Sequence, residues 1–124
     1  GLLYHLPRPW ELLDRIARAS DRLFLSTHYA LADEASVTVR GLRGRMYREY
    51  GVDDPLSGLS PESFWPTLDS LDAMLRAAGF TSIRVISDDP AFANGPVVGL
   101  AATAGRGRLR RVAARLPARL GRRR

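Results

Sequence analysis

The first nine residues constrain the fold of this chain more than any other segment. Residues 1–6 read GLLYHL, and prolines follow at positions 7 and 9, where an amphipathic helix begins. A short apolar run that ends in tyrosine and histidine is typical of a buried strand that opens into a crevice. Ligands of open α/β sheets bind outside the carboxyl ends of the strands. We therefore expect Leu2 and Leu3 to end a strand whose sheet continues upstream, and Tyr4 and His5 to lie at the edge of a site.

Helix and strand patterns alternate along the rest of the chain. Apolar residues at helical spacing predict a helix over 9–20 and a second helix that ends at residue 78. The second helix is expected to begin after a cap at Ser60-Pro61 or Thr67 and to be ended by Gly79. Apolar, β-rich runs predict a strand that starts at Leu23 and ends near His28, and further strands over 81–87 and 97–103. This order predicts an α/β fold with a parallel sheet whose final strand is antiparallel.

Residues 30–60 show no clean period and contain several glycines. We expect a long connection here, of the kind that is usually functional or mobile, with a short helix possible near 42–50. Arg45 and Tyr47 belong to a cluster of arginine and tyrosine that would suit an anionic or aromatic ligand. The alternative is a solvated loop whose arginines pair with acidic neighbours such as Glu49.

Charge divides the chain into two parts. Residues 1–105 hold ten arginines and all 13 acidic residues, a net charge of −3, whereas 106–124 hold nine arginines and no acid. The asymmetry argues against a globally basic nucleic-acid-binding surface and for a basic appendage. Apolar residues at helical spacing in the tail suggest a helix that binds RNA or an anionic membrane surface. A partly disordered arginine-rich terminus is the alternative.

Cysteine is absent from the 124 residues, which excludes disulfides, thiolate metal sites and a cysteine nucleophile. This usage is compatible with a cytoplasmic protein. The two histidines have no evident third ligand, so we expect no metal site. No apolar run reaches the length of a membrane span.

Several segments together resemble the C-terminal half of class I S-adenosylmethionine-dependent methyltransferases. The pattern Gly1–Leu6 followed by Pro9 resembles the segment after the fourth strand of the family, in the form found in tRNA wobble-uridine carboxymethyltransferases and their relatives. Residues 23–27 resemble the fifth strand. Residues 64–67 (FWPT) and 74–80 (MLRAAGF) resemble the helix and turn before the sixth strand. Residues 97–103 resemble the seventh strand, which is inserted antiparallel between the fifth and sixth strands of the family.

The resemblance implies that 1–104 are the C-terminal part of a Rossmann-like methyltransferase domain, followed by an arginine-rich tail over 105–124. It implies S-adenosyl-L-methionine (SAM) as cofactor and a small molecule or tRNA as methyl acceptor. The family's glycine-rich turn and the acidic residue that holds the ribose hydroxyls are missing from this sequence. Ser26 also stands where relatives often have glutamate. Because the glycine-rich turn and the acidic residue are missing, we expect the chain to lack transferase activity and cofactor affinity when isolated.

The expected site gathers residues from four segments. Its members are the catalytic candidates His5 and His28, the cofactor-binding candidates Leu3 and Tyr4, and the substrate-binding candidates Tyr29, Arg45, Tyr47 and Trp65. A histidine at the mouth of the crevice could take a proton from the acceptor. The alternatives are structural: His5 caps a loop, backbone groups satisfy His28, and Trp65 packs at the start of a helix.

Two other functions remain open from the sequence. The chain could be a non-catalytic binding module whose arginine-rich tail contacts RNA or an anionic surface. It could also be a small hydrolase with His5 or His28 as base, although no nucleophile motif accompanies them. The oligomeric state is undetermined.

Overall fold

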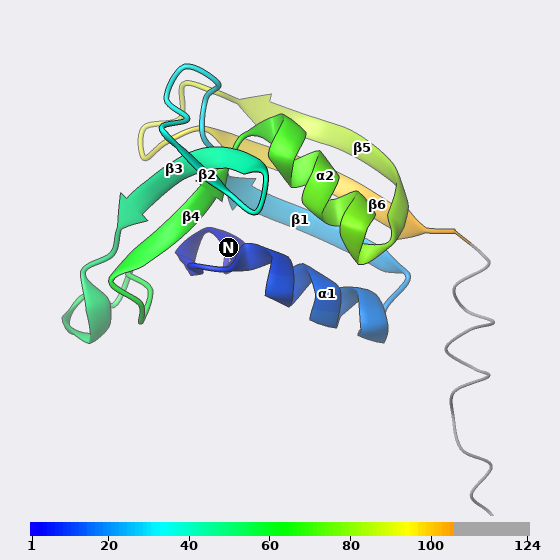
Figure 1. Ribbon diagram of the computed structural model, residues 1–124, viewed down its shortest axis with the longest axis horizontal. Helices are drawn as coiled ribbons and strands as arrows, with labels where there is room; N and C mark the ends of the chain where they lie inside the picture. Colours follow the sequence, from blue (N-terminus) through cyan, green and yellow to red (C-terminus); the bar gives the residue numbers. More distant parts are fainter. Residues whose placement is uncertain (106–124) are drawn as a thin grey trace, which may run out of the picture.

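The computed structural model describes residues 1–105, which form two short sheets and two α-helices (Figure 1). The helical elements are η1 (Leu3–His5), α1 (Pro9–Ala19), η2 (Gly51–Asp53) and α2 (Leu68–Ala78). The strands are β1 (Arg22–His28), β2 (Val37–Val39), β3 (Leu42–Arg48), β4 (Glu62–Pro66), β5 (Phe80–Asp89) and β6 (Val97–Ala104). The predictions about the arginine-rich tail fall on 106–124, outside the described residues. Within 1–105, no helix has the length and apolar character needed to cross a membrane.

The larger sheet has the strand order β1-β6-β5. β6 pairs antiparallel with both neighbours, so β1 and β5 run in the same direction on either side of it. The predicted insertion of an antiparallel final strand between two others is confirmed. The prediction of parallel neighbours is wrong for the described sheets, because the reversed β6 separates the two strands that run in the same direction.

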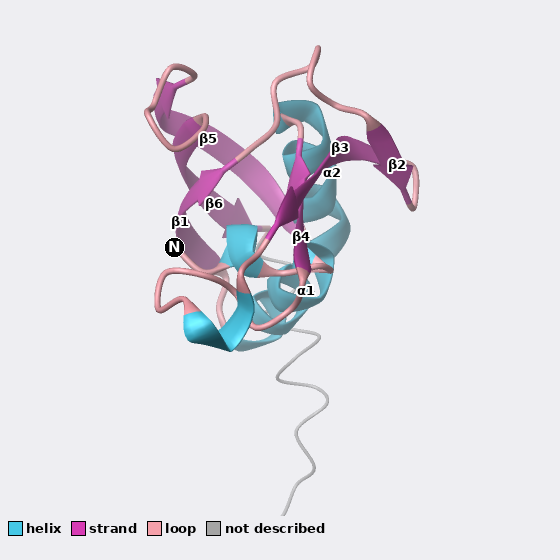
Figure 2. Cartoon of the chain, turned by 90° about the vertical axis from the view of Figure 1, so that its left-hand side faces the viewer, coloured by secondary structure: helices cyan, strands magenta, loops and turns pink. Residues whose placement is uncertain are grey.

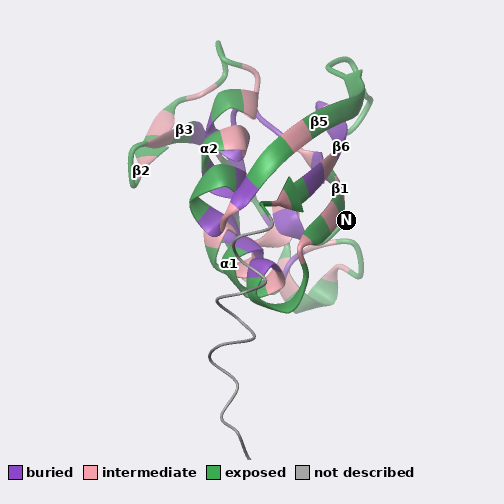
Figure 3. Cartoon of the chain, turned by 90° about the vertical axis from the view of Figure 1, so that its right-hand side faces the viewer, coloured by how far each residue is buried: buried purple, intermediate pink, exposed green. Residues whose placement is uncertain are grey.

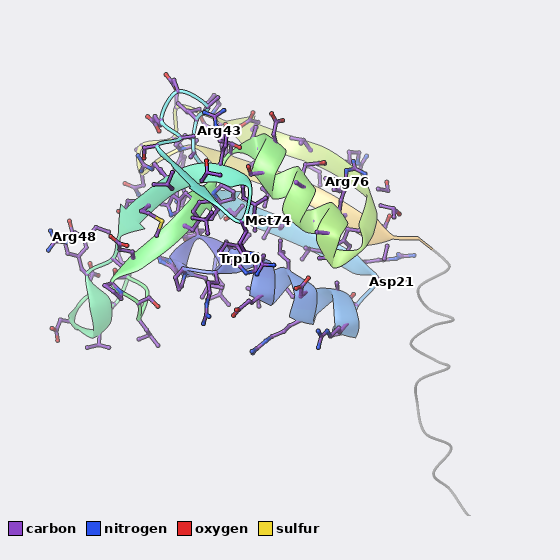
Figure 4. All side chains as sticks on the ribbon, viewed as in Figure 1. Trp10, Asp21, Arg43, Arg48, Met74 and Arg76 are labelled. Atoms are coloured by element: carbon purple, nitrogen blue, oxygen red, sulfur yellow. The ribbon has the colours of Figure 1, made fainter. Side chains whose placement is uncertain are left out.

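One face of this sheet packs against both helices. The core between them is mainly aliphatic, with Leu13 from α1, Leu75 from α2 and Val98 from β6 all fully buried. Met74, labelled in Figure 4, belongs to the same core. The opposite face carries Phe24, which is 68% exposed. Much of β5 is exposed as well (Figure 3).

The predicted ends of α2 are confirmed. Thr67 is the N-cap, and its side chain accepts a hydrogen bond from the Ser70 N–H. Gly79 ends the helix with φ +112°, a left-handed conformation that glycine adopts without a steric penalty. Phe80 follows directly and is fully buried in the same core as Met74 and Leu75.

The prediction of a strand at the start of the chain is wrong. Leu3–His5 form a 3₁₀ turn in which the His5 N–H donates to the Leu2 carbonyl at 3.1 Å. The carbonyl of Leu6 accepts from the Phe64 N–H of β4 at 3.0 Å. The segment therefore uses its backbone groups locally and against β4, and Leu2 remains 59% exposed.

Residues 30–36 and 49–60 lie outside the strands, as the predicted irregular connection over 30–60 implies, but that prediction and the possible helix near 42–50 are wrong for 37–48. β2 and β3 form a hairpin there, and β3 pairs antiparallel with β4 to make a second sheet beside the first (Figure 2). The turn residues Arg40 and Gly41 both have positive φ, as a tight type I′ hairpin turn requires. Phe64-Trp65-Pro66 lies just before α2, as predicted, and also forms most of β4.

Candidate functional site

A cavity of about 690 Å³ lies where the first residues of the chain, the end of β1 and the second sheet meet. The loop after β3 closes one side of it. The lining residues are Gly1, Tyr4, His5, His28, Tyr47, Glu49, Tyr50, Asp54, Pro55, Leu56, Ser57, Trp65 and Asn94. The structure thus brings together five of the eight predicted site residues: Tyr4, His5, His28, Tyr47 and Trp65.

Glu49 is the buried anion of this cavity, with its side chain only 2% exposed. Its carboxylate accepts hydrogen bonds from the hydroxyls of Ser57 at 2.7 Å and Ser63 at 2.8 Å, and from the Gly58 N–H at 2.8 Å. His5 Nδ1 lies 3.2 Å from the carboxylate. Burial alone would raise the pKa of Glu49, but the hydrogen bonds from Gly58, Ser57, Ser63 and His5 outweigh it and lower the pKa.

The ionised Glu49 fixes the tautomer of His5. A carboxylate only accepts hydrogen bonds, so Nδ1 of His5 carries the hydrogen between them. The neutral imidazole then keeps its lone pair on Nε2. A histidine that is oriented by a carboxylate and has a free Nε2 is equipped to take a proton from a bound molecule.

His28 is held by backbone carbonyls instead. Its Nδ1 lies 3.1 Å from the carbonyl oxygen of Gly95 and 3.2 Å from that of Pro96. Gly95 has φ +116°, and a Cβ there would come within 2.7 Å of the Trp65 ring. A glycine is therefore required for the loop to approach both His28 and Trp65.

Aromatic rings form much of the cavity wall. The Trp65 ring stacks with His28 at a centroid distance of 4.8 Å and with Tyr47 at 4.5 Å, both nearly parallel. The Tyr4 ring packs against His5 at 4.3 Å and edge-on against His28 at 4.5 Å. The Trp65 indole N–H donates to the Tyr4 carbonyl at 2.9 Å and ties this wall to the start of the chain.

Arg45, predicted to bind substrate, supports the wall from outside the lining. It lies opposite Trp65 in the β3–β4 pairing, and its guanidinium sits 4.8 Å from the Trp65 ring centroid. It also makes an ion pair with Glu34 at 3.7 Å. These contacts suit it to hold the tryptophan ring by a cation–π interaction.

Leu3 and Tyr29 lie away from the cavity. Leu3 is 2% exposed and belongs to the aliphatic core. Tyr29 is also buried in that core, and its hydroxyl donates to Asp88 at 2.7 Å. Burial, the hydrogen bond to Asp88 and the negative charges of Asp88 and Asp89 raise the pKa of Tyr29 to about 12. Tyr29 borders a separate, smaller cavity of about 190 Å³.

The role of Glu49 was not predicted from the sequence, where this residue is considered only as an arginine partner on a solvated loop. Alternating exposure along β3 places the residue after that strand against the cavity. The available signal was Gly41 directly after the β-branched run Val37-Thr38-Val39, because glycine readily adopts the positive φ of a tight hairpin turn. Once that hairpin is recognised, Glu49 falls at a strand end, although its contact with His5 is not visible in the sequence.

Comparison with known proteins finds likeness among solved structures. No protein-family model matches this chain, and no curated protein matches it either. The N-terminal domain of EvdMO1 with SAH bound superposes with a TM-score of 0.72 and 34% sequence identity over 85% of this chain. The chain shares its fold with part of an SAH-bound domain.

A second structure of the same domain, determined in the presence of SAH and D-fucose, matches equally well, with a TM-score of 0.72 and 34% identity over 85% of this chain. The structure of EvdMO1 itself matches with a TM-score of 0.57 and 30% identity over 84% of this chain. The present chain spans 44–45% of the length of the N-terminal domain structures and 20% of that of EvdMO1.

Proposed function

We propose that this chain is the acceptor-binding part of a SAM-dependent methyltransferase, in which His5 removes a proton from the methyl acceptor. The observation that carries the proposal is the likeness to a domain with SAH bound, at 34% identity over 85% of the chain. SAH is the product that SAM leaves after methyl transfer. The cavity with the His5–Glu49 pair supplies a base that such a transfer can use.

The work of the chain's own residues is to position the acceptor and to move one proton. A hydroxyl placed against Nε2 of His5 passes its proton to that nitrogen as its oxygen becomes nucleophilic. Glu49 keeps the imidazole oriented and balances the positive charge that the ring then acquires. SAM would supply the methyl group from its sulfonium centre.

The described residues do not fit the cofactor itself. In residues 1–105, β4 is the strand that leads directly into an α-helix, and the connection is Thr67, without a glycine-rich turn. Leu3, expected to contact the cofactor, is buried in the core, and Tyr4 alone of that pair lines the cavity. We therefore propose that residues outside this chain hold most of the cofactor, and that the isolated chain is inactive.

A small hydroxylated acceptor is supported better than tRNA. Glu49 and Asp54 are the residues of fixed charge in the cavity lining, and both are acidic. Phosphate groups require cationic partners, so an acidic lining disfavours a polyanion. The N-terminal domain of EvdMO1, part of which shares the fold of this chain, was studied in the presence of D-fucose, a small molecule that carries several hydroxyls.

Calorimetry with SAH tests the first part of the proposal. We expect no saturable heat when SAH is added to the 124-residue chain. A chimera in which residues 1–105 replace the matched part of the EvdMO1 N-terminal domain should bind SAH. Saturable binding to the isolated chain would contradict its assignment as the acceptor side alone.

The same chimera tests the role of His5. With SAM and D-fucose, we expect His5→Ala to lower the rate of SAH release by about 100-fold or more while the affinity for SAH stays unchanged. Arg84→Ala, an exposed change on β5, serves as the control. Unchanged turnover in His5→Ala would exclude this histidine as the base.

A further inference from the structure

Both imidazoles at the cavity have the same nitrogen engaged as a hydrogen-bond donor. Nδ1 of His5 faces the ionised Glu49, and Nδ1 of His28 faces the carbonyl oxygens of Gly95 and Pro96. Carboxylates and carbonyls only accept hydrogen bonds, so each Nδ1 carries the hydrogen. Each neutral ring therefore keeps an accepting lone pair on Nε2.

The two rings differ in the charge beside them. A proton taken up by His5 is balanced by the full negative charge of Glu49, whereas His28 has two neutral carbonyls at its Nδ1. His28 is also stacked flat against Trp65 at 4.8 Å. These surroundings suit His5 to proton transfer and His28 to accepting a hydrogen bond from a fixed direction.

The two rings also border the same part of the cavity. Tyr4 packs against both, with centroid distances of 4.3 Å to His5 and 4.5 Å to His28. The side chains of Trp65 and Tyr47, which stack on each other, also line the cavity, so a ring-shaped molecule bound there meets an aromatic wall. Because both imidazoles line the cavity and contact Tyr4, one ligand in the cavity can reach both histidines.

We propose that His28 is a specificity-determining residue that accepts a hydrogen bond from a second hydroxyl of the acceptor. The site then selects ring-shaped acceptors with two adjacent hydroxyls, a vicinal diol. The assignment of the first hydroxyl to His5 rests on the proposed function. The hydrogen bond to His28 is inferred from the tautomer of the His28 ring and from the Tyr4 side chain, which contacts both imidazoles.

Titrations of the ¹⁵N-labelled 124-residue chain, followed by NMR at the imidazole nitrogens and the Trp65 indole N–H, test this proposal. The aromatic probes are catechol and 2-methoxyphenol, which differ by methylation of one hydroxyl. The saturated probes are cis-cyclohexane-1,2-diol and cis-2-methoxycyclohexanol. We expect the diol of at least one pair to bind about three- to tenfold more tightly than its ether, as one net hydrogen bond provides. The pair that shows the preference identifies the acceptor ring as aromatic or saturated.

Substitution of His28 assigns the preference to this residue. His28→Phe keeps a flat ring against Trp65 but has no acceptor, so the diol and its ether should bind equally. His28→Gln offers a side-chain oxygen and should retain part of the preference. The ¹⁵N shifts of wild-type His28 should show a protonated Nδ1 and an unprotonated Nε2, a measurement that does not depend on how well either variant folds.

Three results would overturn the proposal. They are equal affinity for diol and ether in both pairs, an undiminished preference in His28→Phe, or no shift at His28 with any of the four probes. None of these titrations needs a methyl donor, so their failure would leave the chimera results for His5 intact. Conversely, loss of the base role of His5 would not remove a diol preference that depends on His28.

Discussion

The two sheets of this protein are attached to the rest of the molecule by different chemistry. The β1-β6-β5 sheet packs on α1 and α2 through aliphatic side chains such as Leu75 and Val98. The β2-β3-β4 sheet is anchored by Phe64, but around the cavity it relies on stacked rings and on hydrogen bonds to the buried Glu49. Stability and candidate chemistry are thus concentrated in different regions, joined where β4 leads into α2.

The largest effect is expected in the aliphatic region. Leu75→Ala removes a fully buried side chain and should lower the free energy of unfolding by about 2–5 kcal/mol, through lost burial and the remaining cavity. Urea denaturation measures the change. Leu56→Ala, at a residue that is 84% exposed, is the matched control and should change stability by less than about 0.5 kcal/mol. Equal losses of unfolding free energy in the two variants would contradict the conclusion that stability is concentrated in the aliphatic region.

A smaller loss is expected in the polar region. Glu49→Gln preserves shape but replaces a charged acceptor of several hydrogen bonds, and should cost about 1.5–3 kcal/mol. Because the neutral amide can both donate and accept hydrogen bonds, it no longer fixes the His5 tautomer. The ¹⁵N shifts of His5 should therefore change while those of His28 stay in place. A stability loss without any change at His5 would show that Glu49 serves only to hold the loop.

The pH dependence of stability should distinguish the wild-type protein from the Glu49→Gln variant. The pKa of Glu49 is lower in the folded state than its ordinary value of 4.5. Its contribution is therefore fully present above pH 4.5 and is lost as the pH falls through the folded-state pKa. The stability difference between wild type and Glu49→Gln should shrink in acid, as measured by thermal unfolding at a series of pH values. A constant difference down to about pH 2, well below the ordinary pKa of a carboxyl group, would contradict the lowered pKa.

The smallest effect is expected at the junction of the two regions. Thr67→Ala removes the N-cap hydrogen bond of α2 and should cost about 1 kcal/mol. Thr67→Ser keeps the hydroxyl and should stay close to wild type. If thermal melts place the serine variant with the alanine variant, packing of the threonine methyl rather than capping holds this junction.

The sequence predicted the aliphatic region better than the polar one. The strands near 23–28, 81–87 and 97–103 and both helices were recognised from runs and periodicities that occur within one element. The β2–β3 hairpin was missed because β2 has only three residues and because Gly44 and several arginines conceal the alternation in β3. The initial segment was predicted as a strand because its apolar residues suggest burial, whereas its backbone groups bond locally and to β4.

The sequence by itself determined features that depend on near neighbours. Thr67 caps α2 and Gly79 ends it because each acts on backbone groups a few residues away. Only the tertiary structure decided that His5 meets Glu49, 44 residues along the chain, and that Trp65 stacks with both Tyr47 and His28. Such contacts depend on how the two sheets pack against each other, and no local pattern of residues encodes that packing.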